Sequence, residues 1–260
     1  MRQKIIYYND PLKDEFSGVG PRRSVKIDAS FPFIRRNPVF RFLRLIVYRG
    51  IMTPFAWLYT HMRFRPRFVG REKLRPYRKT GCFFYGNHTQ IPADAFIPNL
   101  FGFPKNHYFI VNPDNIALPG TRNLMMMLGA LPVPTARSGF KPFHEAIRQR
   151  ISEGAAVVIY PEAHIWPYCT WIRPFPATSF HYPAKIQAPV FAFTVTYRKS
   201  RRGKPRIIVY LDGPFFSAAP QVKERQQDLH SQVYQAMRKR AENPDNYAFT
   251  EYRKNPEASL

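Results

Sequence analysis

Short apolar runs alternate with amphipathic segments along most of the chain. The runs are rich in β-branched and aromatic residues and are bounded by Gly, Pro or Asn, which is typical of buried strands. Strands are predicted at residues 82–86, 107–111, 130–133, 155–161, 189–197 and 206–213, and helices at 93–99, 122–128, 141–153, 179–187 and 221–242. With 260 residues in one continuous alternation, the sequence predicts an α/β fold: a single domain whose mixed, mostly parallel sheet is flanked by helices.

The segment 38–64 has a different pattern. It is apolar and aromatic, but Arg41, Arg44 and Arg49 interrupt it, so it lacks the roughly 20 apolar residues of a membrane-spanning helix. Gly50 and Pro54 predict that it divides into two short amphipathic helices, which associate with a membrane surface. The alternative is a pair of core helices that cap the domain. The chain is then read as an irregular arm (1–37), a membrane-associating segment (38–64) and a catalytic domain (65–260).

The charge of the chain favours an anionic partner. Forty Lys and Arg against 17 Asp and Glu give a formal charge of +23, with a sequence pI near 10.4. Nucleic acid, a phospholipid leaflet and a phosphorylated cofactor are all compatible with this charge. Two cysteines, Cys82 and Cys169, form no disulfide framework and favour a reducing compartment, and residues 1–16 do not resemble a secretory signal.

A histidine and an aspartate follow the first predicted strand, in the stretch "FFYGNHTQIPADAF". Ligands of open α/β sheets bind beyond the carboxyl ends of strands, where Asn87 and His88 are expected. Pro92 is expected to open the next helix, which places Asp94 in its first turn and within reach of His88. The carboxylate can then orient the imidazole as a general base for an alcohol. Alternatively, Asp94 only complements the helix dipole and His88 is an ordinary loop residue.

A second strand, in "VIYPEAHIWPY", delivers Glu162 and His164 to the same predicted edge of the sheet. Glu162 is either a solvated loop carboxylate or a group that positions the acceptor or a nearby arginine. A metal site built from these residues with His88 and Asp94 is the third alternative, but no known zinc-ligand spacing such as HExxH is present. We therefore predict no metal and no resident cofactor.

With these segments together, the sequence resembles the lysophospholipid acyltransferase family, in particular its 1-acylglycerol-3-phosphate acyltransferases and as a divergent bacterial-type member. The likeness spans about residues 38–215. It rests on Asn87-His88 with Asp94, on "GALPVPTAR" from Gly129, on "YPEAH" from Tyr160 and on "APVFAFTV" from Ala188. The resemblance implies transfer of a fatty acyl group from acyl-CoA or acyl carrier protein to a lysophospholipid hydroxyl.

Three positions depart from the family pattern. Five residues rather than four separate His88 from Asp94, and Thr135 and Ile165 stand where the family has arginines that hold the acceptor phosphate. Arg122, Arg137 or Arg173 could replace them, because a guanidinium binds phosphate bidentately. Asn87, Glu162 and His164 complete the expected substrate-binding set.

The expected mechanism needs no acyl-enzyme, because the acceptor supplies the nucleophile. Backbone N–H groups near Gly86 or after Pro161 are expected to stabilise the oxyanion. The run Leu124–Leu128, which holds three methionines, either lines an acyl-chain groove or is ordinary core. The expected location is the cytoplasmic face of a membrane, with peripheral or monotopic association.

Two other functions fit parts of the sequence. A lipid-binding relative without catalysis fits the missing arginines. A nucleic-acid-binding protein fits the basic and aromatic stretches "RRSVK", "FIRR", "FRPRF" and "YRKSRRGK", although no known nucleic-acid-binding signature accompanies them. The acyltransferase reading therefore predicts no nucleic-acid partner.

Overall fold

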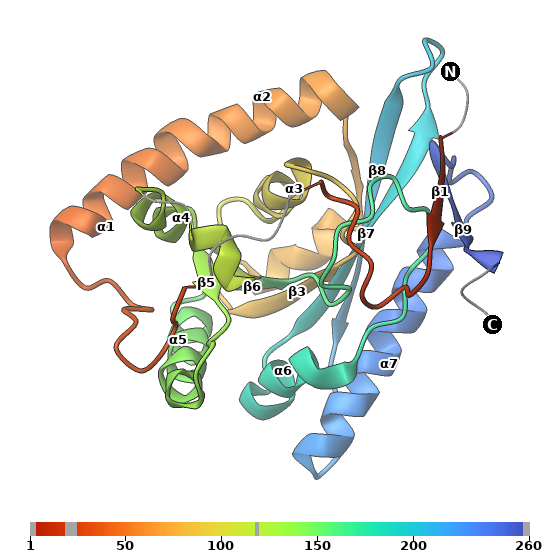
Figure 1. Ribbon diagram of the computed structural model, residues 1–260. Coiled ribbons are helices and arrows are strands. Elements are labelled where there is room, and N and C mark those ends of the chain that lie inside the picture. The colour runs from red at the N-terminus through yellow and green to blue at the C-terminus, as the bar shows by residue number, and fades with distance from the viewer. Residues whose placement is uncertain (1–3, 19–24, 118–119, 257–260) are drawn as a thin grey trace.

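The computed structural model describes residues 4–18, 25–117 and 120–256, and a seven-stranded sheet forms its centre (Figure 1). The strand order is β2-β8-β7-β3-β6-β4-β5. Neighbouring strands are parallel except β7 and β8, which form an antiparallel hairpin, so the mixed, mostly parallel sheet is confirmed. The bounds are β2 Arg67–Val69, β3 Cys82–Gly86, β4 His107–Val111, β5 Ala130–Pro132, β6 Ala156–Ile159, β7 Val190–Lys199 and β8 Pro205–Phe215.

Helices cover both faces of this sheet. Figure 1 shows α2 and α3 on one face and α5, α6 and α7 on the other, which makes three layers. The helices predicted from the sequence are all present: α3 Ala93–Gly102, α4 Arg122–Met127, α5 Phe140–Ser152, α6 His181–Ile186 and α7 Val222–Ala241. Short 3-10 turns occur at Arg71–Tyr77, Pro113–Ile116, Arg137–Gly139 and Ala177–Phe180.

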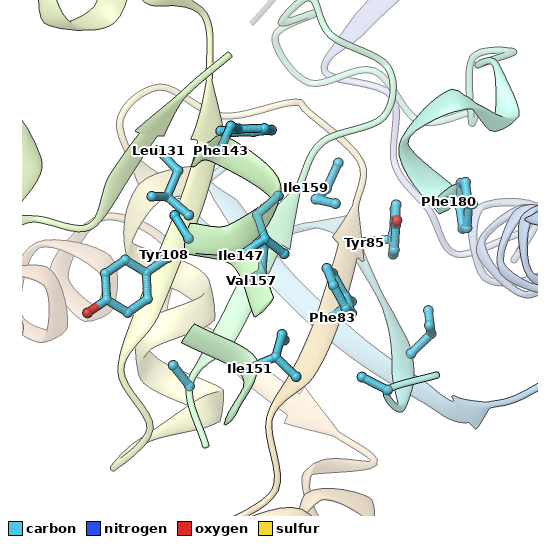
Figure 2. Packing of buried hydrophobic residues seen from close by; sticks show 14 of the residues in the cluster. Phe83, Tyr85, Tyr108, Leu131, Phe143, Ile147, Ile151, Val157, Ile159 and Phe180 are labelled. Atoms are coloured by element: carbon cyan, nitrogen blue, oxygen red, sulfur yellow. The ribbon is translucent and has the colours of Figure 1, made fainter. Parts of the chain in front are cut away.

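The central strand β3 serves two cores, because successive side chains of a strand point to opposite faces. Phe83 and Tyr85 join the cluster on the α5–α7 side, whereas Cys82 and Phe84 join the cluster on the α2–α3 side. Figure 2 shows the first of these clusters, in which the rings of Tyr85 and Phe180 stack with centroids 4.0 Å apart. Burial on both faces fixes where β3 ends, and so fixes the position of His88.

The segment 38–64 is a single unbroken helix, which corrects the predicted division at Gly50 and Pro54. It runs through α1 (Pro38–Leu45), a π-helical stretch (Ile46–Met52) and α2 (Thr53–Phe64). Inside an α-helix, the Pro54 ring would clash with the carbonyl four residues earlier. The wider π turn avoids this, since the Thr53 N–H reaches back five residues to Tyr48 O, and the Thr53 hydroxyl donates to the same oxygen at 2.7 Å.

Two arginines of the same helix bind the catalytic domain. Arg44 donates to Met127 O at 3.2 Å, and Arg49 donates to Lys105 O at 2.7 Å and to Asn106 Oδ1 at 3.0 Å, so both bind the domain. Apolar side chains make up much of the exposed surface instead: Val39, Phe42, Leu43, Leu45, Ile46, Ile51, Phe55, Trp57, Leu58 and Met62. Among the described residues, no helix combines the length and apolarity needed to cross a bilayer.

The N-terminal arm is more ordered than predicted. β1 (Lys4–Tyr8) pairs in parallel with β9 (Thr250–Lys254) in a separate two-stranded sheet. The expectation of an irregular arm is therefore wrong for Lys4–Tyr8. Residues 1–3 and 19–24, which include the two arginines of "RRSVK", lie outside the described residues.

Candidate active site

The turn after β3 is attached to the neighbouring strand β7. The Asn87 side chain accepts a hydrogen bond from Val195 N at 2.8 Å and donates to Val195 O at 3.0 Å. Gly86 fits only without a side chain, because a Cβ there would lie 2.1 Å from the Phe193 ring. Asn87 is buried and both ends of its amide are in use, so it holds the turn in place. This corrects the expectation that Asn87 contacts substrate.

His88 and Asp94 meet within this turn. The distance from His88 Nδ1 to Asp94 Oδ2 is 2.8 Å, and the same oxygen accepts the N–H groups of Thr89 and Gln90, each at 2.8 Å. Pro92 is the N-cap of α3 and Asp94 lies in its first turn, so the extra residue between His88 and Asp94 is absorbed by the loop. With Nδ1–H donated to the carboxylate, Nε2 is the ring atom left to accept a proton.

His88 and Asp94 differ in how far their side chains are buried. The Asp94 side chain is 4% exposed, whereas the His88 side chain is 19% exposed, so the carboxylate is enclosed and the imidazole retains access to solvent. Asp94 Oδ1 is buried and has no hydrogen-bond partner among the described residues. This arrangement suits a base that is oriented from behind by a fixed carboxylate.

Tyr160 supports the imidazole from one side, and sequence reasoning did not single it out. The two rings stack with centroids 4.3 Å apart and planes inclined by 15°, and the Tyr160 hydroxyl donates to the Asp94 backbone carbonyl. Burial and the nearby Asp94 charge raise the pKa of Tyr160 well above its ordinary value, so the phenol stays protonated. Its position directly before "PEAH" was the available signal, but a tyrosine at a strand end has many ordinary uses.

Glu162 positions the backbone of His88. Its Oε2 accepts the His88 N–H at 3.1 Å and a guanidinium N–H of Arg173 at 3.1 Å, while Oε1 accepts the Arg173 backbone N–H at 3.0 Å. Burial raises the pKa of Glu162, and the Arg173 charge and three N–H donors oppose that rise. Of the alternatives for Glu162, the geometry therefore favours a positioning role through an arginine.

Arg173 is enclosed by protein on all sides. It is 0% exposed, its guanidinium lies 4.8 Å from the centroid of the Trp166 ring, and it also donates to the carbonyls of Pro11 and His164. A side chain with no exposed surface and a buried carboxylate partner is not a phosphate ligand. This corrects the expected role of Arg173.

The remaining predicted residues have their contacts with other parts of the chain. His164 Nδ1 pairs with Glu15 Oε2 at 3.0 Å, where the N-terminal arm passes over the loop that follows β6. Trp166 Nε1 also donates to Asp14 O in this arm, at 2.7 Å. Arg122 is exposed and its guanidinium packs 4.6 Å from the Phe31 ring centroid. β6 and β4 separate β5 from β3, a spacing of about 14 Å along the sheet, and the exposed Arg137 follows β5 by five residues.

The backbone donors around His88 are already in use. The N–H groups of His88, Thr89 and Gln90 donate to carboxylates, and those of Ala163 and His164 donate to Tyr160 O and Glu162 O. None of these five can hold an oxyanion without breaking an internal hydrogen bond. The expected donors for an oxyanion are therefore not found at these positions.

Neither cysteine resembles a nucleophile. Both are buried, and burial raises the pKa of each thiol, Cys82 and Cys169, to about 12. Within the described residues, no group of three or more His, Cys, Asp or Glu side chains is arranged to hold a metal ion. His88 and Asp94 stay the candidates for the catalytic groups of the site.

The fold is an α/β sheet in which a histidine hydrogen-bonded to an aspartate follows the carboxyl end of the central strand. The family model described as Acyltransferase matches residues 65–197, about half of the chain. The chain therefore belongs to this acyltransferase family.

The fold is similar to the crystal structure of the 1-acyl-sn-glycerophosphate (LPA) acyltransferase PlsC from Thermotoga maritima. The TM-score is 0.53 and the sequence identity 16%, with 80% of this chain and 84% of that chain covered. No curated protein matches the sequence.

Proposed function

We propose that this acyltransferase transfers a fatty acyl group from a thioester donor to a hydroxyl of a lysophospholipid such as 1-acylglycerol-3-phosphate. The observation that carries the proposal is the 2.8 Å hydrogen bond from His88 Nδ1 to a carboxylate enclosed by protein, in a chain of the acyltransferase family. The fold similarity to an acyltransferase that acts on 1-acyl-sn-glycerophosphate supports this class of acceptor.

In the proposed reaction, His88 Nε2 removes the proton of the acceptor hydroxyl as its oxygen attacks the thioester carbonyl. Asp94 holds the imidazole in the required tautomer and stabilises the imidazolium that forms. The acyl carbon gains a bond to the acceptor oxygen and loses its bond to the donor sulfur, and the proton on His88 is then available to the departing thiolate. Because the acceptor is the nucleophile, the buried cysteines take no part.

The lipid substrate explains the exposed apolar face of the helix 38–64. We propose that this face inserts shallowly into the cytoplasmic leaflet, as peripheral or monotopic association, while the net charge of +23 attracts anionic lipid. With Arg173 buried, we propose that exposed cations bind the phosphate of the acceptor, and Arg122 and Arg137 stay candidates. No metal or resident cofactor enters the reaction as proposed.

Replacing His88 with Ala tests this function. We expect kcat/KM for acyl transfer to fall about 10²- to 10⁴-fold, as measured with labelled donor and 1-acylglycerol-3-phosphate. His181→Ala, at the start of α6, is the matched control and should retain activity. Undiminished turnover in His88→Ala would refute the mechanism, and vesicle binding without acyl transfer by the wild-type protein would favour the lipid-binding alternative.

A further inference from the structure

A second feature of the carboxyl edge of the sheet is a strongly basic pocket of about 530 Å³. It lies between the C-terminal end of α2 and the turn that joins β7 to β8. Its cations are Arg63, Arg65, Arg201, Arg202, Lys204 and Arg206, and no carboxylate lines it. Six cations in one small concave site predict an anionic ligand.

The charge of this pocket is not neutralised within the described part of the chain. None of its six cations forms an ion pair there, whereas the neighbouring Arg198 reaches Asp245 at 3.5 Å. Arg63 and Arg65 lie at the end of α2, where cations complement the exposed carbonyls of a helix. That role does not apply to the other four cations, which lie in the β7–β8 turn and at the start of β8. Their charge is therefore not explained by contacts within the fold.

Two connections join the pocket to the turn that holds His88. Arg63 donates to the Tyr168 hydroxyl at 2.9 Å, and the Tyr168 N–H donates to Thr89 O at 3.0 Å. On the other side, the Tyr197 hydroxyl donates to Thr89 Oγ1 at 2.6 Å. Ser200, which lines the pocket, follows Tyr197 by three residues at the end of β7, a distance of about 10 Å along an extended chain. A ligand in the pocket therefore lies within reach of a linear arm that ends at His88.

The size and chemistry of the pocket select one class of ligand. Its volume falls in the range of small-molecule sites, whereas docking of a carrier protein needs an interface of about 800 Å² on each partner. Arginines bind phosphate by paired, charge-assisted hydrogen bonds. Met62 and Pro205 add an apolar wall against which a purine can pack.

We propose that this pocket binds the phosphorylated nucleotide part of an acyl-CoA donor, with the pantetheine arm extending from there to His88. The inference rests on the proposed function, because it assigns one of the two thioester donors to the same site. It makes the turn at 200–206 a determinant of donor choice, separate from the groups that react.

The test uses the full chain with the double variant Arg201→Gln/Arg202→Gln. Both side chains are exposed at the turn, so their loss leaves the core intact. We expect KM for acyl-CoA to rise about tenfold with kcat unchanged, because two charge-assisted contacts are lost. The matched control is Lys223→Gln/Lys239→Gln on the exposed side of α7, which removes equal charge and should leave KM unchanged.

A second measurement does not depend on acyl transfer. We expect 3′-phosphoadenosine 5′-diphosphate to bind the wild-type protein and the α7 control with the same Kd, and the Arg201/Arg202 variant about tenfold more weakly. Equal Kd values in all three proteins would overturn the proposal. So would a loss of binding to anionic vesicles with an unchanged KM for acyl-CoA, or an equal rise in KM for acyl carrier protein. Nucleotide binding by a wild-type protein without acyl transfer would refute the proposed function while supporting the pocket as a nucleotide site.

Discussion

Asp94 orients His88 with a single carboxylate oxygen that accepts three N–H groups, and this crowding constrains what can replace it. In Asp94→Asn, one amide oxygen can still accept some of these bonds, but the negative charge behind the imidazole is lost. We expect kcat to fall about 10²- to 10⁴-fold, because the imidazolium loses its stabilising partner. Single-turnover acyl transfer measures the effect.

Asp228→Asn on the exposed side of α7 is the control for this change. Both variants remove one carboxylate, so a general effect of net charge would appear equally in both. Equal activities of the two variants would contradict the role given to Asp94.

Glu162 and Arg173 form a buried pair whose effect should appear as stability. Glu162→Gln leaves the Arg173 guanidinium buried without a charged partner, which costs about 3–5 kcal/mol in the free energy of unfolding. Glu153→Gln removes a carboxylate from the partly exposed pair with Arg150 and should cost about 1 kcal/mol or less. Urea denaturation of both variants measures the difference, and similar losses would show that the buried pair is not needed for stability.

At the scale of elements, local pattern predicted the strands well. β3 and β4 occur at the predicted residues, because each is a continuous apolar run closed by turn-forming residues. The sequence did not predict β1, because its partner β9 lies near the other end of the chain and local sequence does not indicate such a pairing. The unbroken helix 38–64 was missed because tertiary contacts of Tyr48 and Arg49 stabilise a π turn where Gly50 and Pro54 suggest a break.

The helix 38–64 is joined to the sheet by a buried polar network centred on His107. The Tyr48 hydroxyl donates to Asn99 Oδ1 and accepts the His107 N–H at 3.0 Å, and His107 Nδ1 lies 2.9 Å from the same Asn99 oxygen. Burial, with the nearby charges of Arg49 and Lys105, lowers the pKa of His107 to about 3. His107 is therefore neutral in the folded protein throughout the physiological range.

This lowered pKa makes stability depend on pH. Between about pH 6.5 and 3 the unfolded chain protonates His107 and the folded chain does not, so stability is full above pH 6.5 and falls with decreasing pH. From pH 7 to pH 5 the expected loss is about 2 kcal/mol. His107→Gln should be less stable at pH 7 but should lose about 2 kcal/mol less over the same interval, as measured by urea denaturation at both pH values. An identical pH dependence in the two proteins would contradict the assignment.

At the scale of the whole molecule, the sequence predicted which strand ends meet but not which side chains face the ligand. His88, Asp94 and Glu162 come together because parallel strands β3 and β6 end at the same edge, which follows from alternation alone. Whether an arginine faces solvent depends on packing against distant segments. Arg173 is covered by residues of the N-terminal arm and by Trp166, contacts that no local pattern encodes.

The exposed apolar face of the helix 38–64 lies on one side of the molecule and leads to a prediction about vesicle binding. Phe42 and Trp57 are 63% and 54% exposed, and burying both in a leaflet contributes roughly 2 kcal/mol, or about a thirtyfold change in partitioning. We therefore expect Phe42→Ser/Trp57→Ser to bind anionic vesicles about thirtyfold more weakly in a sedimentation assay. Phe216→Ser, which removes an equally exposed ring after β8, is the control and should bind as the wild type does. Equal partitioning of all three proteins would place the membrane contact elsewhere.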